Sequence, residues 1–126
     1  MNPVRLILDT SAVAAYPSVH VREPIGEVYD SDASFGVPVA ALPAAAAQVK
    51  DHDRVAALMR EPGFVALELT VDRWRQIAAT LELVGWDVAI AHVVIAAGEA
   101  DCEILSRRPE LYRALSDDDP PVIPLG

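Results

Sequence analysis

Two acidic residues, Asp9 and Asp87, are the side chains of this sequence best placed to do chemistry. Asp9 ends a short apolar run, residues 5–8, and is followed by two hydroxyl residues, Thr10 and Ser11. A buried strand that ends in an acid delivers a carboxylate to the carboxyl edge of a sheet, where open α/β sheets bind their ligands. A carboxylate at that edge can bind a divalent metal ion.

Asp87 comes directly before an almost wholly apolar stretch, residues 88–97, which is predicted to be helical. An acid at the start of a helix caps the free backbone N–H groups of the first turn. A lone charge at the rim of a core can also be a functional group. The spacing alone favours capping and leaves both interpretations open.

The elements that must position these acids alternate along the chain. Strands are predicted at residues 5–8, 37–40, 64–69, 103–106 and 122–125, and helices at 11–16, 21–30, 40–60, 70–84 and 88–97, with a helical turn at 109–115. Thr70 is predicted to cap the fourth helix. Strands that alternate with helices at this spacing predict a small parallel sheet between two layers of helices, a three-layer α/β/α fold. In such a fold we expect Asp9 to lie at the carboxyl edge of the sheet.

Size and composition limit the classes of protein that fit. The chain has 126 residues, enough for one domain, which we expect to span residues 1–126, and its 52% hydrophobic content excludes a disordered chain. A net charge of −9 repels nucleic acid unless basic residues cluster or metal ions neutralise a pocket. The single cysteine allows no intrachain disulfide, no apolar run approaches the roughly 20 residues that span a bilayer, and no secretory signal is recognisable. We therefore expect a cytoplasmic protein without a membrane partner.

Stretches spread over nearly the whole chain occur in the order and at the spacing of a known family. They read RLILDTSAVAA at residues 5–15, VPVAALPAAAA at 37–47, WDVAIAHVVIAA at 86–97, and CEILSRRPELYRAL at 102–115 followed by PPVIPL. In this ordered set the chain resembles the PIN-domain family, particularly the VapC-type toxin ribonucleases of toxin–antitoxin pairs.

The resemblance implies a doubly wound domain with an acidic pocket at the carboxyl ends of its strands. In the family that pocket holds one or two Mg²⁺ or Mn²⁺ ions, which activate water for attack on an RNA phosphodiester. Hard oxygen ligands suit these ions, and the ions stabilise the charge that develops on the phosphate. The family also implies a homodimer and a cognate antitoxin protein as partner.

The chain departs from the family at two of its four acidic positions. Ala44 stands where the third helix should begin with an acid, and Arg108 stands two residues after Ser106, where another acid is expected. The resemblance leaves Asp9 and Asp87 as catalytic acids and metal ligands. At about 4 Å and an effective dielectric near 20, one unit-charge interaction contributes roughly 4 kcal/mol, so an arginine at that position opposes metal binding.

The remaining site residues are expected to handle phosphate. Ser11 and Ser106 would supply hydroxyls that orient water or phosphate, and Arg108 would bind phosphate directly or replace the metal by an ion pair with Asp9 or Asp87. Glu110 lies in the wrong register to replace a lost acid. We therefore expect an endoribonuclease whose activity and metal affinity are weak or absent.

The alternative is a non-catalytic PIN-like module that binds a partner protein or RNA. A nucleotide- or phosphate-binding α/β protein is disfavoured, because the chain lacks a glycine-rich phosphate loop. Three further side chains are predicted to be structural. His92 is expected to be a packed or surface histidine, Cys102 a buried inert thiol, and the stripe that contains Trp74 part of the core, with any exposed edge a candidate dimer contact.

Overall fold

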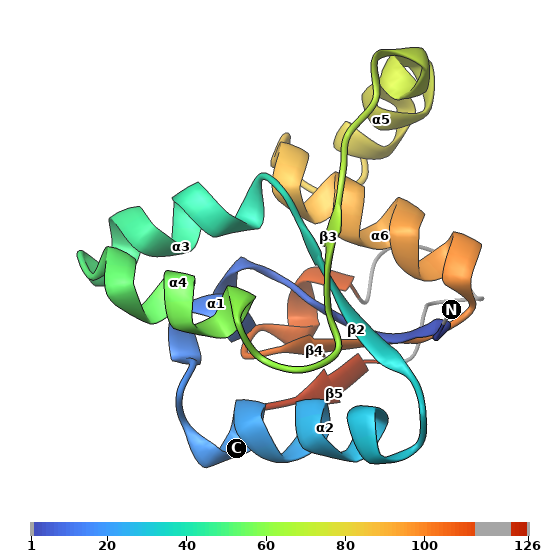
Figure 1. Cartoon of the computed structure of the whole chain (residues 1–126). Coiled ribbons are helices and arrows are strands. Elements are labelled where there is room, and N and C mark those ends of the chain that lie inside the picture. The colour runs from blue at the N-terminus through green and yellow to red at the C-terminus, as the bar shows by residue number, and fades with distance from the viewer. Residues whose placement is uncertain (1, 113–121, 126) are drawn as a thin grey trace.

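The computed structural model describes residues 2–112 and 122–125, and it has a parallel sheet flanked by helices (Figure 1). The strands are β1 (Val4–Leu8), β2 (Ser34–Pro38), β3 (Phe64–Leu67), β4 (Glu103–Ser106) and β5 (Val122–Pro124). The helices are α1 (Thr10–Ala15), α2 (Val19–Asp30), α3 (Ala41–Val49), α4 (His52–Met59), α5 (Trp74–Leu81) and α6 (Val88–Ala100), with 3-10 helices η1 (Val71–Arg73) and η2 (Pro109–Tyr112). The predicted three-layer α/β/α fold is confirmed.

The sheet has the strand order β3-β2-β1-β4-β5, and all neighbouring strands are parallel. The chain builds outward from β1 to β2 and β3 on one side and then returns to place β4 and β5 on the other. The order therefore reverses between β1 and β4, which makes this boundary a topological switch point. Leu8 and Leu105 are paired at the carboxyl ends of the two strands, so the residues that follow them start from adjacent positions.

The core has two layers because successive side chains of a strand point to opposite faces of the sheet. Leu6 and Leu8 belong to the cluster formed with helices α1 to α4, whereas Ile7 packs with residues of α6 and η2. Figure 1 shows α2 and α6 on opposite sides of the sheet, with α5 lying outside α6.

Helix α6 is apolar nearly all round because it lies between two partners. Val93 and Ala97 contact the sheet-side cluster, while Ala91 and Ile95 pack with Ile77 of α5. A helix covered on both sides needs no wide polar face, which explains its sequence.

The predicted helix over residues 40–60 is wrong in one respect, because it is two helices. Lys50 adopts a left-handed conformation with φ 55° and ends α3, and the Asp51 carboxylate then accepts a hydrogen bond from the backbone N–H of Arg54 at 3.2 Å. The Arg54 guanidinium donates to the carbonyl oxygens of Ala14 and Tyr16 at the end of α1, which fixes α4 against that helix.

Other boundaries differ more modestly from the predictions. Strand β2 begins at Ser34, earlier than the predicted range 37–40, and every residue in it is buried. Thr70 makes no capping hydrogen bond, because η1 comes before α5. Helix α6 continues past Gly98 and ends where Asp101 turns left-handed with φ 52°. The predicted helical turn is present as η2, while residues 113–115 of that prediction lie outside the described residues.

Within the described residues, no helix combines the length and the apolar character needed to cross a bilayer.

Candidate functional site at the switch point

A pocket of about 190 Å³ lies at the carboxyl ends of β1 and β4, at the topological switch point. We call it the switch-point pocket. Its lining residues are Asp9, Thr10, Ser11, Ala44, Gln48, Asp87, Ala89, Ile90, Arg108 and Leu111. Asp9 and Asp87 thus line one cavity, as the sequence predicts, and so do Ser11 and Arg108. Ser106 is fully buried behind this lining.

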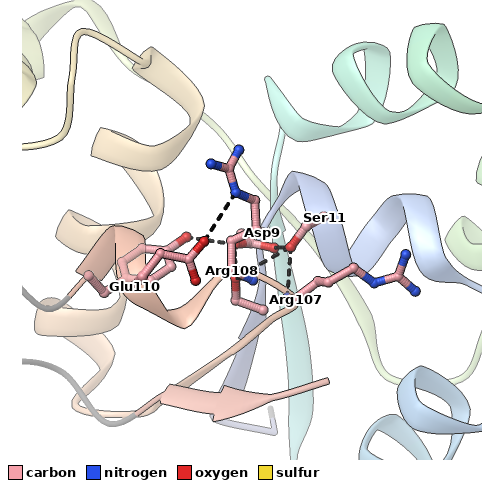
Figure 2. Close-up of polar contacts among 7 residues, drawn as sticks. Asp9, Ser11, Arg107, Arg108 and Glu110 are labelled. Carbon is pink, nitrogen blue, oxygen red and sulfur yellow. Dashed lines mark hydrogen bonds and ion pairs between the residues drawn. The ribbon is translucent and has the colours of Figure 1, made fainter. Parts of the chain in front are cut away.

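The Asp9 carboxylate is only 2% exposed and accepts four hydrogen bonds, including one from Ser11 (Figure 2). Its Oδ1 accepts from the Ser11 hydroxyl at 2.6 Å and from the Ala12 backbone N–H at 3.0 Å. Its Oδ2 accepts from the Ser106 hydroxyl at 2.5 Å and from the Tyr112 hydroxyl at 2.8 Å. Asp9 is therefore the N-cap of α1 and also the acceptor for groups on β4 and η2.

The hydroxyls of Ser11 and Ser106 each donate one hydrogen bond and accept another within this network. Each hydroxyl has one proton, and each gives it to Asp9. Ser11 Oγ accepts from the backbone N–H of Arg107 and Ser106 Oγ from that of Arg108, each at 2.9 Å. Neither serine thus has a proton left to donate to a water or a phosphate in this arrangement. Their predicted role in phosphate handling stays a prediction.

Tyr112 is a site residue that the sequence reasoning missed. Its side chain is 1% exposed, and burial raises the pKa of its phenol far above the ordinary value, with the negative charge of Asp9 and the hydrogen bond between them adding to the effect. The phenol therefore keeps its proton and acts as a permanent donor to Asp9. The signal that could have found it is a tyrosine within a helical turn that directly follows a buried strand.

Asp87 is exposed and caps α6, with its Oδ1 accepting from the backbone N–H of Ile90 at 3.1 Å. The capping interpretation is confirmed. Since Asp87 also lines the switch-point pocket, the functional interpretation stays open alongside it.

Arg108 lines the pocket without pairing with either acid, so the expected Asp9–Arg108 or Asp87–Arg108 ion pair is wrong. Its Nε lies 3.5 Å from Glu110 Oε1, and the two side chains are 61% and 56% exposed (Figure 2). The physical reason is that the Asp9 oxygens are already fully bonded, while Glu110 is two residues away and accessible. An exposed pair of this kind contributes at most about 1 kcal/mol, so the guanidinium is available to an anion.

A divalent metal ion does not fit the donors that this pocket offers. A carboxylate has about four lone-pair sites, and all of those on Asp9 are used by protein donors. Ala44 and Arg108 also line the pocket, and neither supplies a carboxylate. Among residues 2–112 and 122–125, no cluster of three or more histidine, cysteine, aspartate or glutamate side chains is arranged to hold a metal. To bind Asp9, an ion would have to displace existing donors and tolerate Arg108.

Gln48 is a lining residue of the pocket that the sequence reasoning missed. It lies one helical turn after Ala44 on α3, so both residues face the same side of that helix. Its amide supplies a hydrogen-bond donor and an acceptor to the pocket. The i to i+4 spacing from Ala44 is the signal that could have identified it.

The three side chains predicted to be structural have different outcomes. His92 is 6% exposed within α6, and burial, followed by the positive charge of Arg73, lowers the pKa of its imidazole. Cys102 is buried, and burial raises the pKa of its thiol to about 11, as expected for an inert cysteine. Trp74 is 61% exposed, so its assignment to the core is wrong; Ile77 carries that packing instead.

The comparison with known proteins adds no relative to this description. No protein-family model matches the chain, and no curated protein matches it either.

Proposed function

We propose that this chain is a PIN-like protein similar to the VapC-type toxin endoribonucleases, and that its metal-dependent RNA hydrolysis is weak or absent. The observation that carries the proposal is the meeting of Asp9 and Asp87, far apart in sequence, in one pocket at the switch point of a parallel sheet. That is the location at which open α/β sheets bind ligands. The ordered stretches of sequence quoted above supply the link to the family.

The weakness of the activity follows from the donors in the pocket. Asp9 offers no free lone pair, Asp87 is exposed and already caps a helix, and Arg108 adds a positive charge. We propose that Mg²⁺ or Mn²⁺ binds weakly or not at all. Arg108 would then hold an RNA phosphate without a metal ion to activate water. Such an arrangement binds substrate but does not lower the barrier to hydrolysis.

The second candidate function is a non-catalytic PIN-like module that binds a partner protein or RNA. Large apolar side chains are exposed on and beside α5, with Val71 88%, Trp74 61%, Leu83 56% and Trp86 71% exposed. Groups of exposed apolar residues are typical of protein interaction sites. They favour a protein partner, either a second copy of this chain or an antitoxin, over RNA, which the net charge of −9 repels. With its single cysteine the chain suits a reducing compartment, and we propose the cytoplasm.

An RNA cleavage assay tests the proposal. Wild type and Asp87→Asn are incubated with labelled single-stranded RNA in Mn²⁺ and in chelator. Asparagine caps a helix about as well as aspartate, so Asp87→Asn keeps α6 intact while it removes the carboxylate charge. We expect wild type to show no more Mn²⁺-dependent cleavage than Asp87→Asn shows. Cleavage by wild type that requires Mn²⁺ and disappears in Asp87→Asn would contradict the proposed loss of activity.

A further inference from the structure

We infer that Asp9 is a structural anchor of the switch point, held by protein donors in place of a metal ion. The inference goes beyond the proposed function, because it assigns Asp9 a role that does not depend on what the pocket binds.

The four donors to Asp9 come from separate parts of the chain. Ser11 and the Ala12 N–H belong to α1, the Ser106 hydroxyl to the end of β4, and the Tyr112 hydroxyl to η2. The Asp9 backbone N–H also donates to the Leu105 carbonyl at 3.3 Å. One side chain at the end of β1 therefore joins the central strand to its neighbour and to two flanking helices.

The network also explains how a buried carboxylate is tolerated. A buried charge is costly unless it is hydrogen-bonded or paired. Among the described residues no cation bonds Asp9, and its charge is stabilised by two serine hydroxyls, one phenol and one backbone N–H. Hydrogen bonds to an ionised acceptor are stronger than neutral ones. The protein thus supplies to Asp9 what an ion supplies in a metal site.

This role reverses the expected effect of removing the charge of Asp9. In a metal site without its ion, ligand acids repel one another, so converting one of them to an amide relieves repulsion. Here an amide at residue 9 would present an NH₂ group to hydroxyl or N–H donors, and at least one buried donor would lose its acceptor. Asp9→Asn should therefore destabilise the fold in the absence of any metal.

Thermal unfolding in chelator tests the inference, using wild type, Asp9→Asn, Tyr112→Phe and Asp87→Asn. We expect the Tm of Asp9→Asn and that of Tyr112→Phe each to fall by about 5 °C or more. The matched control Asp87→Asn should stay within about 2 °C of wild type, because an exposed asparagine retains the cap. If Asp9→Asn does not fold, the Tm of Tyr112→Phe still tests the inference, because this variant removes one of the four donors to Asp9 and keeps the aromatic ring.

The second arm measures the Tm of wild type during titration with Mn²⁺ alone, and we expect no rise. The inference is overturned if Asp9→Asn or Tyr112→Phe keeps the wild-type Tm or exceeds it. It is also overturned if Mn²⁺ raises the wild-type Tm and Asp9→Asn removes that rise. The cleavage assay addresses a different question, since a protein anchored by Asp9 can still fail or succeed in cleaving RNA. Failure of the inference and failure of the proposed function are thus separate results.

Discussion

Replacing Tyr112 by phenylalanine removes one hydroxyl from the Asp9 network and leaves the aromatic ring in place. The ring is 1% exposed and belongs to the core cluster with Ile7 and Val93, so the apolar burial of the side chain is retained. The lost interaction is the 2.8 Å hydrogen bond to Asp9 Oδ2. The effect on stability therefore reports this bond more directly than a change to alanine would.

The magnitude follows from the charge and burial of the acceptor. A hydrogen bond to a charged group contributes about 1.5–3 kcal/mol to stability. Three donors remain on Asp9, so the carboxylate is not left bare, and we expect Tyr112→Phe to lower the free energy of unfolding by about 1.5–2 kcal/mol. With a urea m-value near 1.5 kcal/mol/M, the midpoint of unfolding should fall by about 1 M.

Two other tyrosines of the same chain provide matched controls for this measurement. Tyr29 is 49% exposed, so Tyr29→Phe should change stability by less than about 0.5 kcal/mol. Tyr16 donates to Glu61 Oε1 at 2.7 Å, but that contact is only partly buried, so Tyr16→Phe should cost about 0.5–1 kcal/mol. The assay is urea unfolding followed by circular dichroism. The reasoning is refuted if Tyr112→Phe moves the midpoint no further than Tyr29→Phe does.

Four further predictions concern other parts of the molecule. The double variant Arg108→Asp/Tyr112→Phe should bind Mn²⁺ in calorimetry, because it frees a lone pair on Asp9 and reverses the charge at residue 108. The control is the single variant Tyr112→Phe, which keeps Arg108. Equal Mn²⁺ binding by both variants would contradict the charge argument. Because the pKa of His92 is lowered in the folded protein, the unfolded state binds more protons than the folded state as pH falls below about 6.5. The free energy of unfolding should therefore drop from pH 7 to pH 5, and it should drop by less in His92→Leu. Equal losses in both proteins would exclude His92 as the cause. Lys50→Gly should raise the free energy of unfolding by about 0.5 kcal/mol, because glycine adopts the left-handed conformation at φ 55° without strain, and a lower urea midpoint would count against this. Trp74→Glu, on the exposed side of α5, should shift any dimer toward monomer in light scattering. An unchanged mass from a dimeric wild type would place the interface elsewhere.

The place of Asp9 could be predicted from the sequence because it depends on topology. Parallel strands bring their carboxyl ends to one edge of the sheet, so an acid directly after the buried strand at residues 5–8 must lie at that edge. The spacing of Asp87 alone favours a helix cap, and its place beside Asp9 is expected only from the resemblance to the PIN-domain family.

The hydrogen-bond partners of Asp9 could not be predicted in the same way. The orientation of Tyr112 depends on how the 3-10 helix η2 folds back onto the end of β4, and no sequence periodicity records that turn. The Arg108 side chain is long and exposed, so its partner is decided by small differences in distance, and Glu110 is the nearer acid. The sequence thus indicates which residues gather at the site but not which of their atoms remain free.

The break between α3 and α4 shows a similar limit for the fold. Alanine-rich sequence favours helix throughout residues 40–60, and only the capping hydrogen bond of Asp51 and the left-handed Lys50 interrupt it. Strand β2 was predicted too late because Ser34 is polar, yet its position between β1 and β3 buries it. The helix break thus depends on a local cap that overrides helix propensity, and the early start of β2 depends on its tertiary position.

The central position of β1 has a consequence for how the pocket can adapt to a ligand. Backbone amides of a strand with neighbours on both sides exchange with solvent only through large openings, whereas exposed termini and side chains move at little cost. The wall that carries Asp9 and Ser106 should therefore be the slowest-exchanging part of the molecule. Adjustment to a bound molecule would come from the exposed Arg108 side chain and the start of α6, so this cavity combines a rigid strand end with lining residues that can move.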